Sequence, residues 1–146
     1  MRKLLLLGLI LAAIVQLAQH REFFGTKATD TASSQAVQTR GDDILGRAFE
    51  QQRSNVQVTS SGVVVKVLPD DEQGSRHQRF LVRVESGQTV LIAHNIDLAA
   101  RLENLKAGDH VEFSGEYEWN NKGGVIHWTH RDPAGRHVAG WVRKAQ

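Results

Sequence analysis

The sequence predicts a mainly β fold: a five-stranded OB-like barrel, on the oligonucleotide/oligosaccharide-binding plan, with an N-terminal helix. Apolar and polar residues alternate with a period of two in five short segments after Asn55, turn-forming residues separate these segments, and a helical pattern lies between the third and the fourth. Three strands, a helix and two strands are the order of this partly open Greek-key barrel, whose closure protects sheet edges. A small β-sandwich and an SH3-like barrel are the alternatives.

Residues 1–20 have the pattern of a signal peptide or an N-terminal anchor. A cationic start, Met1-Arg2-Lys3, precedes an apolar run from Leu4 to Ala18, which has the length of a signal-peptide core and is short for a membrane span. The run ends in a poor small-residue cleavage site, so an uncleaved anchor is the alternative. We therefore expect an exported protein, periplasmic or secreted, that meets the inner membrane only through this segment.

Residues 21–41 are predicted to be a flexible linker, and residues 42–146 the barrel domain. The linker is rich in Thr, Ser, Ala and Gln and carries too little apolar surface to order itself. Asp42 and Asp43 are suited to the start of a helix, where carboxylates satisfy free backbone amides. From Ile44 to about Arg53 the helix would place an apolar stripe against the barrel.

Alternation defines the strands that follow. They are Val56–Leu68 with a bend at Gly62, Phe80–Val84, Thr89–Ala93, Val111–Trp119 and Val125–His130. The helix between the third and fourth strands is predicted over Leu98–Leu105, because three leucines share one face there. Alternation also assigns Tyr117 and Trp119 to the core, and it places Trp128 on the same face as Ile126.

Charge and cysteine content limit the function classes. The chain has no cysteine and a pI of about 9.2, but residues 41–146 carry 13 basic and 14 acidic side chains, so the basicity belongs to the leader and linker. A near-neutral domain lacks the broad positive field that drives polyanion binding. A local basic patch remains in the tail, formed by Arg131, Arg136, Arg143 and Lys144.

Several sequence blocks resemble a known bacterial family. They are VLPDD at residues 67–71, GSRHQ at 74–78, AHNIDLA at 93–99 and the signature GEYEWNxKGGVIHWTHxDP from Gly115 to Pro133. Together they resemble a family of short exported bacterial proteins that is defined as a domain of unknown function, and the resemblance covers about residues 49–141. It implies an exported OB-like domain and brings no established activity, cofactor or catalytic residue.

Histidines supply the candidate chemistry. Imidazole is a suitable general acid or base near neutral pH, so we take His94, His127 and His130, with Asp132 as a partner, as candidate catalytic residues. His127 and His130 would lie on opposite faces of a strand unless the strand ends or bulges at Thr129.

A divalent metal could bind in the same region, although the spacing assigns no metal site. His130, Asp132 and His137 would converge if the chain loops back between them, and such groups suit zinc. The structural alternative is that these histidines pin a loop to the barrel by hydrogen bonds.

Ligand binding is predicted at the loops. The segments Asp70–Gln78 and Asn120–Gly124 would flank the mouth at which OB folds take ligands. The candidate ligand-binding residues are Arg76, His77, Asn120, Lys122, Arg131 and Arg136.

The leading hypothesis is an exported OB-like binding module for nucleic acid, a polysaccharide or another polymer, or an envelope protein. A histidine- or metal-dependent hydrolase such as a secreted nuclease is one alternative. A structural or assembly protein of the envelope is the other.

Overall fold

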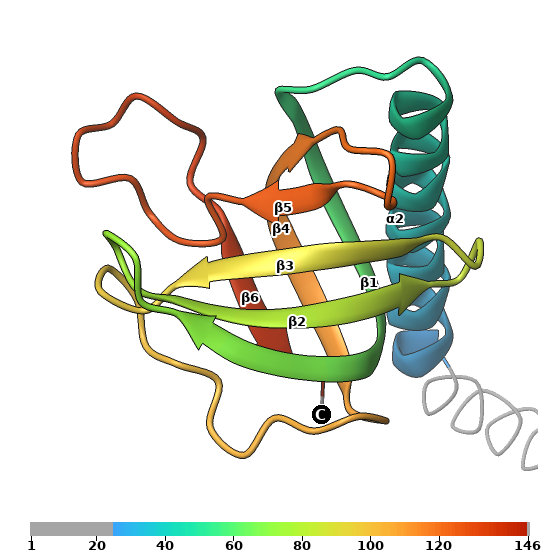
Figure 1. Cartoon of the computed structure of the whole chain (residues 1–146). Coiled ribbons are helices and arrows are strands. Elements are labelled where there is room, and N and C mark those ends of the chain that lie inside the picture. Colours follow the sequence, from blue (N-terminus) through green and yellow to red (C-terminus); the bar gives the residue numbers. More distant parts are fainter. Residues whose placement is uncertain (1–24, 146) are drawn as a thin grey trace, which may run out of the picture. The chain divides into compact units, whose positions relative to one another are not determined.

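The computed structural model describes residues 25–145, with side chains from residue 31 (Figure 1). The predicted leader and residues 21–24 lie outside the described residues. The chain divides into two units at Ala36 and Val37, and every strand of the described chain belongs to the second unit. No helix in residues 25–145 is long and apolar enough to span a membrane.

Helix α2 runs from Gly25 to Glu50. Its predicted start at Asp42 and Asp43 is therefore wrong, and the helix includes much of the segment predicted as a linker. Asp42 lies inside the helix, away from the free amides of a helix start, and its carboxylate instead accepts hydrogen bonds from Ser60 Oγ at 2.5 Å and from the Ser86 backbone amide at 3.0 Å.

The apolar stripe near the helix end is confirmed. Leu45 and Ala48 are buried in the core, and Ile44 packs against it. Gln52 follows the helix in a left-handed conformation with φ 53°. The backbone amides of residues 51–53 bond carbonyls of the last helical turn, which closes the helix end.

The six strands of residues 25–145 form one sheet, which confirms the mainly β class. They are β1 (Val56–Asp71), β2 (His77–Val84), β3 (Thr89–Asn95), β4 (His110–Glu118), β5 (Val125–His127) and β6 (Trp141–Lys144). Five of them form a ring in the order β1-β2-β3-β5-β4, which is closed by pairing of β1 with β4; β6 pairs with the first half of β4. Only the β3–β5 pairing is parallel. The ring has the five predicted strands and agrees roughly with the OB-like plan, whereas the sixth strand, β6, was not predicted.

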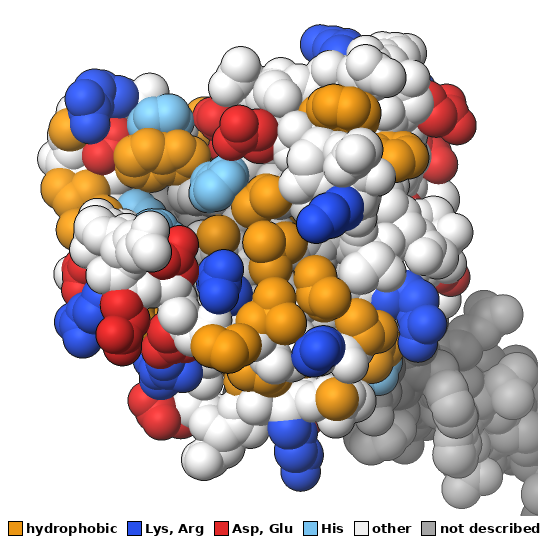
Figure 2. All heavy atoms as spheres, in the orientation of Figure 1, with side chains coloured by type: hydrophobic (Ala, Val, Ile, Leu, Met, Phe, Trp, Pro, Cys, Tyr) orange, Lys and Arg blue, Asp and Glu red, His pale blue; other side chains and the backbone are white. Residues whose placement is uncertain are grey.

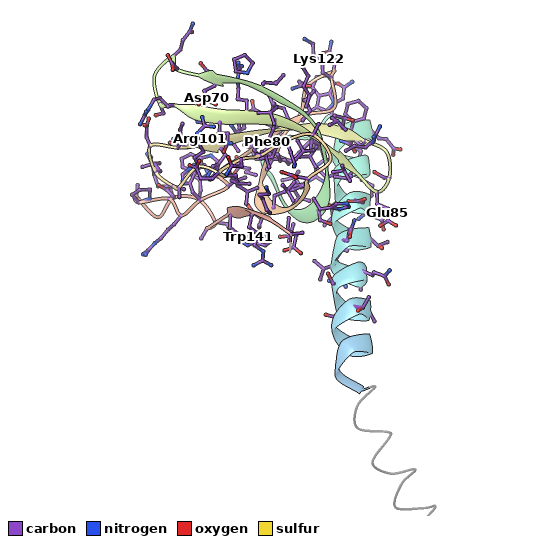
Figure 3. The ribbon with its side chains drawn as sticks, turned by 90° about the horizontal axis from the view of Figure 1, so that it is seen from below. Asp70, Phe80, Glu85, Arg101, Lys122 and Trp141 are labelled. Atoms are coloured by element: carbon purple, nitrogen blue, oxygen red, sulfur yellow. The ribbon has the colours of Figure 1, made fainter. Side chains whose placement is uncertain are left out.

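Alternating side chains fill the interior of the ring, as the sequence predicts. Phe113, Tyr117 and Phe80, which is labelled in Figure 3, are fully buried there. Valines and isoleucines of β1 to β5 surround them. Trp119 packs against the core from the edge, and its indole N–H donates to the Phe49 carbonyl at 3.1 Å. That bond joins the end of β4 to the end of α2.

The predicted helix over Leu98–Leu105 is wrong: in the described chain, residues 96–109 form turns. Side-chain amides take the place of helical hydrogen bonds here. Asn95 Oδ1 accepts from two following backbone amides, and the buried Gln78 amide bonds both the N–H and the C=O of Leu102 at 2.9 and 3.0 Å. Leu102 is thereby buried, while Leu98 is 49% exposed. Three leucines at helical spacing were therefore insufficient evidence for a helix.

Candidate functional site

A pocket of about 260 Å³ lies where β2 begins and β3 ends. We call it the imidazole pocket, and its lining residues are Ser75, His77, Ala93, Asn95, Leu98, His127, Trp128 and His130. On the face shown in Figure 2, histidine side chains gather around hydrophobic ones. The pocket brings together two candidate catalytic residues, His127 and His130, with one candidate ligand-binding residue, His77.

The end of β5 explains how His127 and His130 reach the same pocket. β5 stops at His127, and Trp128 adopts φ 53°, a left-handed conformation that is unusual for a bulky residue. The regular alternation of side chains therefore ends before Thr129. This is the condition under which the sequence allowed His127 and His130 to lie on the same side. Trp128 consequently leaves the face of Ile126: instead of entering the core it is half-buried and stacks on His137, with ring centroids 3.7 Å apart.

Two glycines make room for this turn. A Cβ at Gly115 would lie 2.4 Å from the carbonyl oxygen of His127, and one at Gly140 would lie 2.0 Å from that of Trp128. Any side chain at either position would collide with the backbone that carries the pocket. Gly140 also donates its N–H to the His130 carbonyl at 3.0 Å. The segment from His127 to His130 is thus held between β4 and the chain that enters β6.

The His94 ring is hydrogen-bonded within the protein at both of its nitrogens. It is 2% exposed, its Nδ1 lies 2.9 Å from Thr129 Oγ1, and its Nε2 lies 3.0 Å from the Ala100 carbonyl oxygen. Since a carbonyl only accepts, Nε2 carries the proton. Burial lowers the His94 pKa; hydrogen bonding to Ala100 opposes this, and nearby His130 and His77 add to the lowering. Both ring nitrogens are occupied, as in the predicted structural alternative.

Asp132 is likewise committed to a loop. Its carboxylate accepts backbone N–H bonds from Ala134, Arg136 and His137 at 2.9, 2.7 and 3.2 Å. These bonds, led by that of Ala134, lower the Asp132 pKa. The carboxylate fixes the loop between β5 and β6.

The three candidate metal ligands have separate partners. His137 Nδ1 lies 3.3 Å from Glu116 Oε2, and His130 Nδ1 lies 2.8 Å from the Arg131 carbonyl oxygen. Asp132 accepts from loop amides. In the described part of the chain, no three His, Asp or Glu side chains are grouped so that they could hold a metal ion.

The three pocket histidines differ in how their rings are engaged. His127 Nε2 lies 3.4 Å from Glu118 Oε2. Burial lowers the His127 pKa; Glu118 opposes the shift, His77 reinforces it and Glu116 opposes it. His130 uses only Nδ1, and the His77 ring has no hydrogen bond or ion pair among the described residues. His77 is therefore the imidazole most available to a ligand.

The predicted ligand-binding loops do not form one mouth. Arg76 and His77 lie where β2 meets the end of β3, and the Arg76 guanidinium pairs with Asp97 at 2.8 Å. Asn120 and Lys122 lie at the other end of the β2–β3 hairpin, where Gln88 Nε2 donates to the Gly123 carbonyl at 2.9 Å. Only the first loop borders the imidazole pocket.

The basic tail is distributed over several ion pairs. Arg143 and Lys144 belong to β6, which the sequence did not predict, and they pair with Glu112 at 2.6 Å and Asp109 at 2.9 Å. Arg131 and Arg136 are exposed on the loop before β6, and Arg136 Nε lies 3.9 Å from Asp132. At another edge, Arg101 pairs with Asp70 (Figure 3). The predicted basic patch is thus partly neutralised.

Sequence reasoning missed five lining residues: Ser75, Ala93, Asn95, Leu98 and Trp128. The sequence placed Leu98 in a predicted helix and Trp128 on the same strand face as Ile126. The glycines at 115 and 140 were the available signal that the chain packs unusually closely near Trp128, but their neighbours are distant in sequence.

Comparison with known protein families matches residues 28–146 to the family described as Protein of unknown function (DUF3465). Neither the curated proteins nor the solved structures gave a match. The matched region covers more than half of the chain and includes every strand of the described residues. The chain therefore belongs to the DUF3465 family of proteins of unknown function.

Proposed function

We propose that this chain is an exported binding module whose imidazole pocket receives a hydroxyl-rich group, namely one sugar unit of a polysaccharide. The observation that carries the proposal is the composition of the pocket: three imidazoles, one hydroxyl, one carboxamide and an indole line it, and no carboxylate does. Polar groups that fix a ligand beside an aromatic wall are typical of small-molecule sites.

The protonation states favour a ligand that both donates and accepts hydrogen bonds. His130 donates from Nδ1 to a carbonyl, so its Nε2 is an acceptor when the ring is neutral. Glu118 beside Nε2 of His127 favours a proton there and leaves Nδ1 as an acceptor. Asn95 and Ser75 add donors. Sugar hydroxyls complement such a mixed set, whereas a phosphate offers only acceptors at neutral pH.

Export is supported by the cationic and apolar pattern of residues 1–20. An exported protein meets the polymers of the cell envelope, so a polysaccharide partner agrees with this location. Nucleic acid has less support at this pocket, because Arg76, next to His77 in the chain, is paired with Asp97.

A hydrolase is the second candidate, and one observation favours it. Glu118 lies 3.4 Å from His127, and a carboxylate beside an imidazole can support a general base. The same pocket would then bind the substrate. Turnover of the bound polymer, lost in His127→Ala, would identify this activity.

The test is isothermal titration of the full chain with chitotetraose, cellotetraose and a single-stranded oligonucleotide. His77→Ala is the informative variant, because its ring has no partner in the described chain and its loss should leave the fold intact. Removing one ligand hydrogen bond should weaken sugar binding about fivefold to tenfold. His110→Ala is the matched control, since His110 is exposed and outside the pocket.

Three results would overturn the proposal. One is no binding of either oligosaccharide, and another is equal affinity of His77→Ala and the unmodified chain. The third is tighter binding of the oligonucleotide with a steep loss in salt, which would identify a nucleic-acid partner instead. If no polymer binds, the envelope-assembly role becomes the leading hypothesis.

A further inference from the structure

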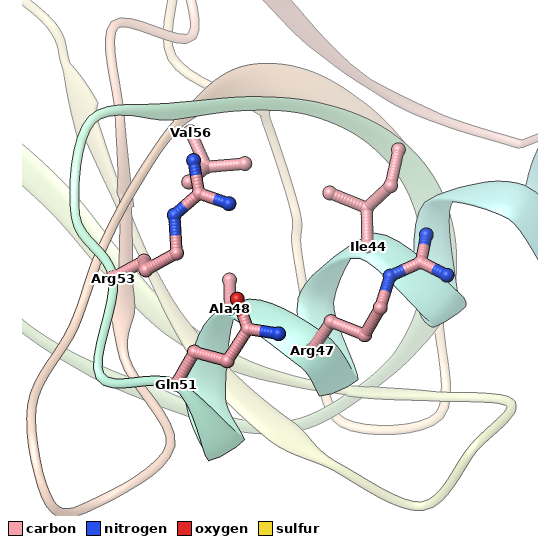
Figure 4. A pocket seen from close by; sticks show the side chains of 6 residues that line it. All are labelled: Ile44, Arg47, Ala48, Gln51, Arg53 and Val56. Atoms are coloured by element: carbon pink, nitrogen blue, oxygen red, sulfur yellow. The ribbon is translucent and has the colours of Figure 1, made fainter.

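A second pocket, of about 220 Å³, lies between the end of α2 and the start of β1 (Figure 4). We call it the guanidinium pocket, and its lining residues are Ile44, Arg47, Ala48, Gln51, Arg53 and Val56. None of them lines the imidazole pocket. The two pockets are therefore independent features of the domain.

The guanidinium pocket has a polar rim and an apolar floor. In Figure 4, Arg47 and Arg53 stand on opposite sides with Gln51 between them, while Ile44, Ala48 and Val56 complete the lining. Ala48 is buried, and the other two apolar residues pack against the core. This floor is built into the domain and does not depend on exposed side chains alone.

Neither arginine has a partner within the described part of the chain. Among the described residues, neither guanidinium takes part in an ion pair or a side-chain hydrogen bond. Asp43 and Glu50 lie one turn from Arg47 on the same helix, yet neither pairs with it. Most other arginines of the barrel do have a partner, as Arg76, Arg101 and Arg143 show. Two unpaired guanidinium groups on one pocket thus form a local positive site.

The chemistry of guanidinium selects the ligand class. Its planar fork binds a carboxylate or a phosphate through two parallel hydrogen bonds. The partial negative charge at the end of α2, about half an electron, opposes an anion but is smaller than the two positive charges. The volume is below the roughly 300 Å³ at which pockets begin to enclose drug-sized ligands, so only a small group fits.

We infer that the guanidinium pocket binds an oxyanion, a carboxylate or phosphate, that is carried on an apolar group. The oxyanion lies between Arg47 and Arg53 and accepts a further hydrogen bond from the Gln51 amide, while the apolar part covers Ile44 and Val56. A short acyl or alkyl phosphate has this chemistry. A free phosphate can make the hydrogen bonds to the arginines but has no apolar group to cover Ile44 and Val56.

The experiment titrates the full chain with hexyl phosphate, inorganic phosphate and hexanol by calorimetry. Hexyl phosphate should bind more tightly than either of the other two, because it alone meets both the rim and the floor. Arg47→Ala and Arg53→Ala should each weaken its binding about tenfold or more, since each removes hydrogen bonds to a charged group. Arg47→Lys, which keeps the charge and loses the fork, should lose affinity as well.

Arg83→Ala is the matched control: Arg83 is exposed on β2, unpaired among the described residues and outside the pocket. It should bind hexyl phosphate like the unmodified chain. Equal weakening by Arg83→Ala would show general charge attraction and overturn the inference. Inorganic phosphate binding as tightly as hexyl phosphate would overturn the role of the floor. Unchanged binding in both Arg47→Ala and Arg53→Ala would overturn the site.

Discussion

The close approach at Gly140 makes a sharp prediction about stability. In Gly140→Ala, the new Cβ would lie 2.0 Å from the carbonyl oxygen of Trp128 and 2.5 Å from that of Ser114, although real contacts of this kind are not shorter than 3.0 Å. Both obstacles are backbone atoms, so no side chain can rotate away. The chain before β6 must therefore move by about an ångström from β4, from the Trp128 turn, or from both.

The expected cost has two parts. Forcing one methyl group into a close-packed site costs about 1–3 kcal/mol. The movement also strains the hydrogen bond from Gly140 N–H to the His130 carbonyl, which is 3.0 Å long and contributes about 1 kcal/mol. We expect Gly140→Ala to lower the free energy of unfolding by about 2–4 kcal/mol. Because the shift displaces Trp128 and His130, ligand binding at the imidazole pocket should weaken too.

Urea unfolding of the full chain, followed by tryptophan fluorescence, measures this change. Gly46→Ala is the matched control, because it is the same substitution inside α2 at a position with no atom within 4 Å of the new Cβ. Alanine is the better helix former, so this variant should gain about 0.5–1 kcal/mol. If Gly140→Ala unfolds within about 0.5 kcal/mol of the unmodified chain, the close approach is wrong.

Three further predictions concern buried polar groups. In Gln78→Leu, both bonds to the Leu102 backbone are lost, so the free energy of unfolding should fall by about 2–4 kcal/mol in urea titrations; a change below about 1 kcal/mol would contradict the anchoring role. His94 has a lowered folded-state pKa, so the unfolded chain takes up a proton first as the pH falls below about 6.5, and stability falls until the folded-state pKa is passed. His94→Gln should flatten that part of a thermal-unfolding pH series relative to the exposed-site control His110→Gln, and an unchanged slope would rule His94 out as its source. Asp132 has a lowered pKa, so its contribution is complete above about pH 3.9 and is lost as the pH falls through the lower folded-state value. Asp132→Asn should lower the melting temperature at pH 7, and its melting temperature should fall less than that of the unmodified chain as the pH is lowered. An equally steep fall in both proteins would contradict this assignment.

Strands could be predicted from the sequence because their signal is local. Val111, Phe113 and Tyr117 alternate with polar residues and are all fully buried on one face of β4. A strand of nine residues gives several repeats of a period-two pattern, so its buried face follows directly. The short strand β6 lacks this redundancy: Trp141–Lys144 has four residues and is identified only by its pairing with β4.

Helix boundaries were less predictable because polar side chains have competing partners. Asp42 has the residue type of a helix cap, but Ser60 and Ser86, both distant in sequence, offer it hydrogen bonds in the folded domain. Gln78 on β2 satisfies the backbone N–H and C=O of Leu102, which removes the need for a helix there. At Leu102, tertiary hydrogen bonds thus take the place of helical ones.

The candidate site was only partly predictable, because its residue types are visible in the sequence and the tertiary contacts that bring them together are not. Residue type alone identified His77, His127 and His130. Their convergence depends on the left-handed conformation of Trp128, which cannot be predicted from the alternation of apolar and polar residues. Such a conformation costs of order 1 kcal/mol or more and persists only where the surroundings enforce it. Here the surroundings are the two glycine contacts, the stacking of Trp128 on His137 and the bond from Thr129 to His94.

The histidines differ in how many of their ring nitrogens remain free to bind a ligand. His94 lies behind the turn with both nitrogens occupied, so it holds Thr129 in place and has no capacity left for a ligand. His130 has one nitrogen committed, and His77 has none among the described contacts. The number of free ring nitrogens therefore increases from the buried His94 through His130 to His77. This is expected where a rigid framework presents a few available polar groups to a ligand. A ligand that enters the pocket meets His77 and His130, while the strained turn that places His130 there depends on His94.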